Sequence, residues 1–291
     1  MTRHRAICAI TAAWALIATA FVYSDPEDDG GPYEDPRQWR GRESRNIELP
    51  KRDIFPSGDF VFARIRYTSY GEDPDTNFRG RWTIDYPDSD QHLTWRLSEL
   101  TTVKVSKDAS GDFKHAVLRL TDEDLYDYPF IYIIEPGYLE FSEEEVVALR
   151  NYLLRGGFLM VDDFWGDDEW LNWEQQFSRV LNPEEYPMEE LDLSHAIFNC
   201  VFELKEKPQV TTPWHWRGLG GGTSERGEES AVVHYKGVHD KNGRLMVIVC
   251  HNTDLGDGWE REAVFEDYFH EISVKRAYPM GINIVVYALT H

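Results

Sequence analysis

Two long hydrophobic runs near the middle of the chain predict neighbouring strands of a parallel sheet. Residues 130–137 (FIYIIEPG) and 157–164 (GFLMVDDF) are almost continuously apolar, as is typical of strands that helices cover on both faces. Between them, apolar residues recur at helical spacing: Val146, Leu149 and Leu153. Ser142 and Glu145 have the spacing of a capping box at the start of this helix. Strand, helix and strand with short connections predict a right-handed βαβ unit.

The remaining patterns predict shorter elements around this unit. Residues 60–67 (FVFARIRY) alternate in a way that predicts a strand near a sheet edge or with one face in water. A short helix is expected next, with Asp88 or Ser89 as its cap. Leu93, Leu97 and Leu100 form its apolar face. We further expect a strand at 101–106, a helix at 165–181, a loop passing into a strand at 195–204, a hairpin at 231–252 and a closing helix at 280–290. Together they predict an α/β domain at residues 60–291 with a mainly parallel central sheet.

The first 23 residues have the pattern of a leader. Basic residues at Arg3 and Arg5 precede an apolar run, and Ala18-Thr19-Ala20 has the small-x-small pattern of a signal-peptidase site. The run is also just long enough to cross a bilayer as an uncleaved anchor. Both alternatives place the rest of the chain outside the cytoplasm, because basic residues before the run stay inside. We therefore expect an exported protein, either periplasmic or anchored to the cytoplasmic membrane and facing outward.

The composition of the chain limits its partners. Residues 24–59 are acidic and contain prolines and glycines without an apolar period, which predicts a linker. The formal net charge is −22, from 30 basic and 52 acidic residues, so nucleic acid is not expected as a partner. Outside the leader, Cys200 and Cys250 either form a disulfide or remain buried thiols. There is no CxxC pair, and hence no structural zinc site of the usual spacing.

The strand ends carry the candidate chemistry, because open α/β sheets bind ligands at the carboxyl ends of their strands. Asp162 and Asp163 lie at such an end, where they can hold a divalent cation, act as acid and base or bind sugar hydroxyls. The alternative is that one caps a turn and the other is solvated. Asp85 is a candidate for the same crevice. The candidates for contacting a ligand beside it are Arg66, Tyr67 and Trp82.

Two histidines and a tryptophan complete the candidate residues. His195 and His251 are each a candidate metal ligand or base, and each can equally serve to hold a loop by hydrogen bonds. Trp214 precedes a run of glycines, an arrangement that suits either the covering of a sugar or peptide or the anchoring of a long loop.

Several segments, in this order, resemble the family called domain of unknown function 4159. They are WTIDYPDSD, LSELT, LTDEDLYDYPFIYI, EEVVALRNYLLRGGFLMVDDF, HAIF, GRLMVIVCHN and MGINIVVYAL. That family is similar to the class I glutamine amidotransferase-like superfamily, which implies a flavodoxin-like three-layer sandwich. In glutaminases of that superfamily a cysteine nucleophile follows a central strand. Here the matching strand ends in Asp162-Asp163-Phe164, so glutaminase activity is not expected.

Two functions remain open on these observations. The first is a non-catalytic module at the cell envelope that binds an unknown small molecule or an envelope protein. The second is a hydrolase that uses aspartates with His195 or His251, with or without a divalent cation, on a carbohydrate-like or peptide-like substrate. No other cofactor is expected. The hydrolase requires Asp85, Asp162 and a histidine to converge within a few ångströms.

Overall fold

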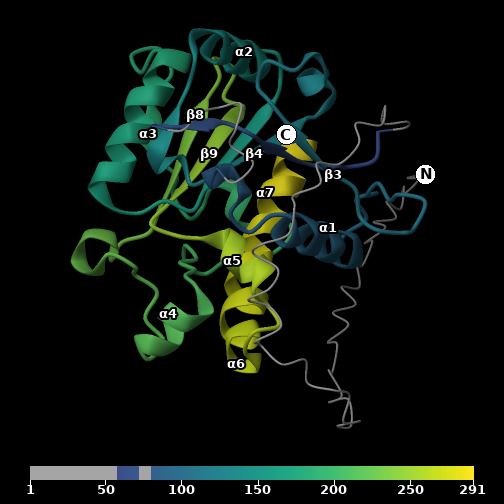
Figure 1. Cartoon of the computed structure of the whole chain (residues 1–291), viewed down its shortest axis with the longest axis vertical. Coiled ribbons are helices and arrows are strands. Elements are labelled where there is room, and N and C mark those ends of the chain that lie inside the picture. The colour runs from purple at the N-terminus through teal and green to yellow at the C-terminus, as the bar shows by residue number, and fades with distance from the viewer. Residues whose placement is uncertain (1–57, 72–79) are drawn as a thin grey trace, which may run out of the picture. The chain divides into compact units, whose positions relative to one another are not determined.

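The computed structural model describes residues 58–71 and 80–291 (Figure 1). The expected leader at 1–23, and the expected linker at 24–59 except for its last two residues, lie outside the described residues. Within the described part, no helix has the length and apolar character needed to cross a membrane.

A mainly parallel sheet forms the centre of the described structure. It has seven strands in the order β3-β1-β4-β6-β9-β8-β7, and the first five of this order run parallel. β8 is antiparallel to β9, and β7 is antiparallel to β8. The strands are β1 (Phe62–Ile65), β3 (His115–Leu118), β4 (Phe130–Ile134), β6 (Phe158–Asp162), β7 (Met188–Glu190), β8 (His234–His239) and β9 (Leu245–His251). A separate antiparallel pair joins β2 (Thr68–Ser69) to β5 (Leu139–Glu140). The predicted α/β class with a mainly parallel sheet is confirmed.

Helices cover both faces of this sheet. Alternate residues of β4 divide between two apolar clusters, with Ile131 and Ile133 in one and Phe130, Tyr132 and Ile134 in the other. The first cluster includes α2 (Glu143–Leu154) and α3 (Gly166–Val180), and the second includes α1 (Asp88–Leu100) and α7 (Tyr278–Thr290). The remaining helices are α4 (Pro213–Gly218), α5 (Leu255–Glu260), α6 (Glu266–Tyr268) and a π-helical segment (Phe269–Ala277) that leads into α7. Figure 1 shows α4 and α6 at the end of the molecule opposite α2.

Short 3-10 turns occupy the connections. They are Arg81–Thr83, Glu123–Asp127, Pro136–Tyr138, Ala196–Phe198 and Gly227–Ser230.

The βαβ unit β4-α2-β6 forms as its sequence predicts. The amide of Glu145 donates to Ser142 Oγ (3.2 Å), and the amide of Ser142 donates to the Glu145 carboxylate (2.9 Å), which completes the capping box. Gly156 ends α2 at φ 113°, a conformation that glycine adopts without strain. The predicted helix at 165–181, the hairpin and the closing helix are confirmed by α3, β8-β9 and α7.

Several local predictions are wrong in whole or in part. β1 lies beside the edge strand β3, as predicted, but it has no wet face because its four residues are all buried. Residues 101–106 do not form the predicted strand, and Val105 makes only an isolated bridge to Phe60. Residues 195–204 form no strand, because the Asn283 side chain of α7 binds the amides of Val201 and Phe202. At α1, neither Asp88 nor Ser89 caps the helix, and Leu100 is exposed.

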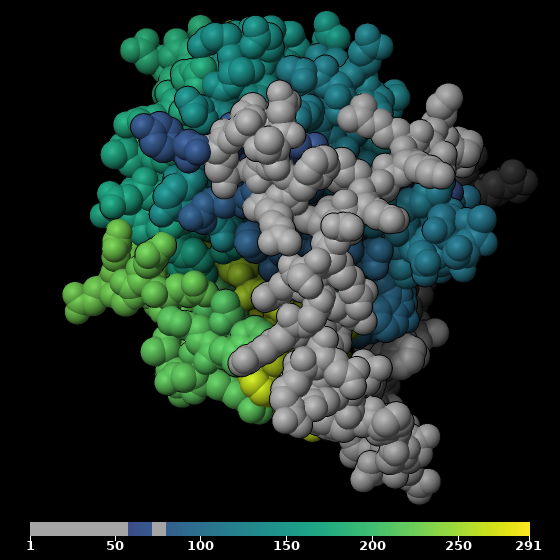
Figure 2. All heavy atoms as spheres, viewed as in Figure 1, coloured from purple at the N-terminus to yellow at the C-terminus, as the bar shows by residue number. Residues whose placement is uncertain are grey.

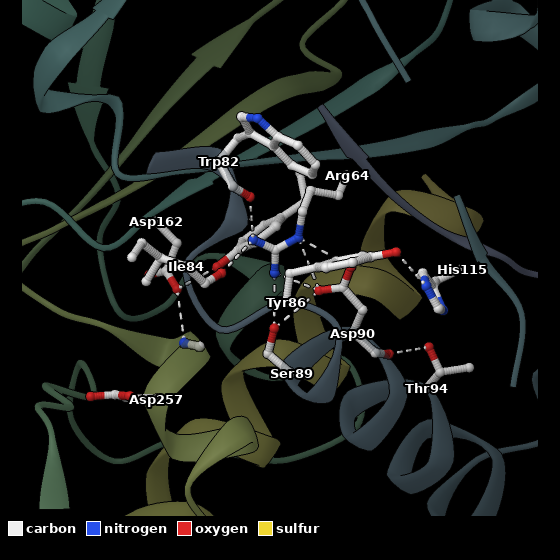
Figure 3. Close-up of polar contacts among 12 residues, drawn as sticks. Arg64, Trp82, Ile84, Tyr86, Ser89, Asp90, Thr94, His115, Asp162 and Asp257 are labelled. Carbon is white, nitrogen blue, oxygen red and sulfur yellow. Dashed lines mark hydrogen bonds and ion pairs between the residues drawn. The ribbon is translucent and has the colours of Figure 1, made fainter. Parts of the chain in front are cut away.

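Arg64 of β1 is buried because it forms an ion pair with Asp90 of α1 (Figure 3). Arg64 Nη2 lies 2.5 Å from Asp90 Oδ1, and both side chains are fully buried. The same guanidinium donates to the carbonyls of Trp82 (3.0 Å) and Ile84 (2.8 Å) and to Ser89 Oγ (2.9 Å). Arg64 therefore holds the segment 82–90, which connects the sheet to α1.

We expect Arg64→Met to lower the free energy of unfolding by about 3–5 kcal/mol, because it leaves the buried Asp90 carboxylate without its partner. Chemical denaturation of the full chain measures the change. Glu99→Gln is the control, since Glu99 is in an exposed pair with Arg96 and its loss should cost less than about 1 kcal/mol. Equal costs for the two variants would show that the buried pair does not hold the fold together.

Candidate functional site

The carboxyl ends of three adjacent strands share an unusual backbone conformation. Glu135 follows β4, Asp163 follows β6 and Asn252 follows β9, with φ values of 48°, 56° and 59°. Asp85, in the segment that Arg64 holds, has φ 59°. Left-handed conformations are uncommon outside glycine and gather at functional sites, where the surrounding structure compensates for the strain.

A cluster of buried carboxylates lies at this edge; we call it the acid cluster, and it consists of Asp85, Asp163, Asp254, Asp257 and Glu260. Single carboxylate oxygens of Asp85, Asp163 and Asp254 all lie within 4.8 Å of one another. Oxygens of Asp85, Asp257 and Glu260 meet the same limit. Asp85 therefore belongs to both groups of three, which combine residues from the loop before α1, the end of β6 and both ends of α5.

Asp162 lies beside the acid cluster and fixes the position of α5. Its Oδ2 atom accepts hydrogen bonds from the Tyr132 hydroxyl (3.2 Å) and from the amides of Leu255 (3.0 Å) and Gly256 (3.2 Å). Figure 3 shows Asp162 facing α5 through this contact. The two aspartates at the end of β6 therefore differ in role, because Asp162 holds the helix while Asp163 joins the acid cluster.

Gly256 allows the Asp85 carboxylate to approach α5 closely. A Cβ atom at position 256 would lie 2.5 Å from Asp85 Oδ2 and 3.3 Å from Asp254 Oδ1. Asp85 is 7% exposed, and no N–H group or hydroxyl of the described residues donates to its buried Oδ2 atom, although the Asp85 and Glu260 carboxyls are in contact. The Oδ1 atom of Asp162 is in the same situation. Such buried oxygens are costly unless a proton or a cation satisfies them.

Burial raises the pKa of every carboxyl group in the acid cluster. The pKa of Asp257 rises to about 7 and that of Glu260 to about 10, first through burial and next through repulsion from Asp85. Burial also lifts the pKa values of Asp163 and Asp254 well above their ordinary value, and it raises that of Asp85 despite the nearby Arg64 and Arg261. The positive groups nearby are therefore too few to keep all of these carboxyl groups ionised, and the raised pKa values favour their protonated forms.

Two arginines lie on either side of these carboxylates. Arg261 Nε is 3.4 Å from Asp257 Oδ1 and 2.5 Å from Glu260 Oε2, and Arg81 pairs with Glu135. The Arg261 guanidinium also lies 5.4 Å from the centre of the Trp214 ring, which is 55% exposed. Trp214 therefore borders the site through Arg261. Figure 2 shows the segment of α4 and the following loop (green) projecting at the surface.

Of the remaining candidates, which follow β1, Tyr67 and Trp82 are packed into the protein and Arg66 is half-buried. Tyr67 is buried and its hydroxyl donates to the carbonyls of Ile134 and Glu135 (both 2.7 Å), so it supports the end of β4. Trp82 is fully buried, and Arg66 lies with its guanidinium 5.8 Å from the Trp82 ring.

The two histidines do not join the acid cluster. His195 packs against His239 and Tyr287, with ring centres 5.8 and 5.5 Å apart. His239 ends β8 opposite the start of β9, so His195 lies at the amino edge of the sheet. His251 lies at the carboxyl edge, but its Nε2 atom is 3.0 Å from the Gly166 carbonyl and its ring packs on Phe164. Burial lowers its pKa to about 4, which keeps the imidazole neutral.

The sequence did not single out Asp254, Asp257, Glu260 or Arg261. A usable signal is present in the segment 254–257, where two aspartates are three residues apart just after a buried strand. This spacing is that of a helix cap, and the Asp257 amide does donate to Asp254 Oδ1 (2.8 Å). Cys200 and Cys250 do not form a disulfide. Both are free thiols, and Cys250 is buried.

Residues 61–289 match the family described as Domain of unknown function (DUF4159). The chain belongs to this family. The match covers every strand of the central sheet and the whole acid cluster. A search of curated proteins found no match.

Asp162 provides a pH test of the site. Burial raises its pKa to about 8 from an ordinary 3.8, so the folded chain holds a proton that the unfolded chain releases. The stability that this proton contributes is fully present below about pH 4 and is lost as the pH rises through 8, with a slope of about 1.4 kcal/mol per pH unit. In Asp162→Asn this contribution to the slope should vanish, because an amide does not titrate. The fold should persist, since the amide oxygen can still accept the hydrogen bonds from Tyr132, Leu255 and Gly256.

The measurement is the free energy of unfolding of the full chain at several pH values between 5 and 9 in a chelating buffer. Asp112→Asn, at an exposed loop position, is the matched control and should follow the wild type. If the curve of Asp162→Asn also runs parallel to that of the wild type, the Asp162 carboxyl does not carry this proton.

Proposed function

We propose that this DUF4159 domain is a ligand-binding module that holds a positively charged ligand at the acid cluster. The observation that carries the proposal is the convergence of Asp85, Asp163 and Asp254 within 4.8 Å, with a buried Asp85 oxygen to which no N–H group or hydroxyl of the described residues donates. A cation satisfies such oxygens and offsets their mutual repulsion, whereas an anion would increase it.

The place of the acid cluster in the fold supports this proposal. Numbered along the chain, the five parallel strands have the order 2-1-3-4-5, which is that of flavodoxin-like sheets. In such sheets the ligand crevice lies outside the strand ends where the order reverses, here between β1 and β4. Asp85 follows β1 in the chain. We infer a flavodoxin-like, amidotransferase-like domain that has exchanged the thiol after its central strand for carboxylates.

The proposed setting is the cell envelope. The basic start, apolar run and small-x-small pattern of residues 1–23 support export, with the leader either cleaved or retained as an anchor. A binding module on the outer side of the membrane would meet its ligand, a small molecule or a part of another envelope protein, without entering the cytoplasm.

Hydrolysis by carboxylates alone is the second candidate, and one observation favours it. Asp257, with a pKa of about 7, has the value that suits an acid or base at neutral pH. Glu225, whose charge helps to raise that pKa, lines a hollow of about 630 Å³ together with His215 and Ser224. His195 takes no part in this version because it lies at the opposite edge of the sheet.

Thermal unfolding of the full chain tests the binding proposal. After treatment with a chelator, the chain is mixed in turn with calcium chloride, spermidine, sodium acetate and glucose. At least one of the two cations should raise the Tm by about 5–10 °C, the shift expected when a ligand is present at about a hundred times its Kd. Asp85→Asn should abolish the shift, and Asp112→Asn should preserve it.

Three outcomes would overturn the proposal. The first is that neither cation raises the Tm of the wild-type chain. The second is that acetate or glucose gives the larger shift. The third is that Asp85→Asn responds to the cations as the wild type does.

A further inference from the structure

We propose that Asp85, Asp163 and Asp254 together bind one divalent cation of the hard, oxygen-preferring class to which Ca²⁺ and Mn²⁺ belong. The inference rests on the proposed function, and it names the ligand and the three residues that hold it. Carboxylate oxygens are the preferred protein ligands of such ions.

The spacing of the three carboxylates suits such an ion. Their ligand oxygens all lie within 4.8 Å of one another. Oxygens that share one Ca²⁺ ion lie no further apart than twice the metal–oxygen distance of about 2.4 Å. The three carboxylates meet this limit, so they are close enough to share one ion.

The two groups of three carboxylates within the acid cluster differ in whether a basic residue contacts them, and this difference favours the group of Asp85, Asp163 and Asp254 as the ion site. The group of Asp85, Asp257 and Glu260 already has a cation, because Arg261 contacts the carboxylates of Asp257 and Glu260. No ion pair joins Asp163 or Asp254 to a basic residue among the described residues. The protein thus supplies its own positive charge to one group and leaves the other for an external ion.

A second observation points to a ligand in the same place. Asp85 Oδ2 is buried and accepts no hydrogen bond from an N–H group or a hydroxyl among the described residues, although the Asp85 carboxyl is in contact with that of Glu260. The oxygen faces Gly256, where a Cβ atom would lie 2.5 Å from it. The glycine therefore makes room for the carboxylate to enter the acid cluster. An unsatisfied oxygen that the structure accommodates in this way is expected where an ion completes the coordination.

The other two carboxylates are oriented by hydrogen bonds from neighbouring groups. The indole of Trp165 donates to Asp163 Oδ1 (3.2 Å), and the amide of Asp257 donates to Asp254 Oδ1 (2.8 Å). Such outer contacts fix the direction of metal ligands and strengthen metal binding. Both are retained when either aspartate is changed to asparagine, so these substitutions remove charge while the local geometry persists.

Calorimetric titration of the chelator-treated full chain with calcium chloride, and separately with manganese chloride, tests the inference. Saturable binding of one ion per chain is expected for at least one of the two metals. Asp163→Asn and Asp254→Asn should each weaken that affinity at least a hundredfold, more than the loss of an outer contact does. Asp112→Asn should bind as the wild type does, and Asp257→Asn should lose less than tenfold because Arg261 serves its group.

A glycine pair separates geometry from charge. Gly256→Ala leaves the net charge unchanged but places a methyl group against Asp85, so it should weaken the affinity for the metal at least tenfold. Gly218→Ala adds a methyl group where no atom lies within 4 Å, and it should have no effect. Circular dichroism checks that each variant is folded, and Asp254→Asn decides the question if Gly256→Ala does not fold.

The outcomes distinguish this inference from the function on which it rests. If neither metal binds while spermidine still stabilises the wild type but not Asp85→Asn, the metal site is wrong and the cation-binding function stands. If Asp257→Asn weakens metal binding as much as Asp254→Asn does, the assignment to Asp85, Asp163 and Asp254 is wrong. If neither metal nor spermidine has any effect, both proposals fail.

Discussion

The buried contact between Arg64 and Asp90 determines where the acid cluster can form. Removing both charges from water is costly, and the cost is offset because the guanidinium also binds Ser89 and the carbonyls of Trp82 and Ile84. These partners lie on either side of Asp85. The ion pair between strand and helix therefore fixes the loop that carries the shared carboxylate, and a lysine could not replace Arg64 because it lacks the planar set of donors.

The parts of the fold that depend on neighbours in the sequence were predicted correctly. The continuous apolar runs at β4 and β6 and the Ser142–Glu145 capping box are local patterns, each formed by residues close together in the sequence. The βαβ unit could therefore be predicted from the sequence. Arg64 shows the opposite case. An arginine in an alternating strand normally indicates a wet face, and its burial depends on Asp90, which is 26 residues away and on a different element.

The candidate site was predicted in part for the same reason. Asp85 and Asp163 were found because a residue at the end of a strand, or in the loop after it, faces the ligand edge of a parallel sheet. Asp257 and Glu260 were not predicted because α5 is too short for a clear helical pattern in the sequence. Its position depends on the hydrogen bonds that its first two amides donate to Asp162, which is distant in the chain. His195 could not be placed from its sequence, since nothing near it indicates which edge of the sheet it occupies.

The acid cluster works against the stability of the fold, and this is the strongest physical reason to assign it a role. Every carboxyl in it has a raised pKa, so the folded chain takes up protons or a cation to remain neutral there. An apolar residue at Asp163 or Asp254 would fill the same space without this cost. Protons relieve the repulsion at those carboxyls whose pKa lies above the ambient pH, as at Glu260. A divalent ion can displace such protons and bind several of the carboxylate oxygens at once. The arrangement is therefore better explained as a binding site than as a structural element.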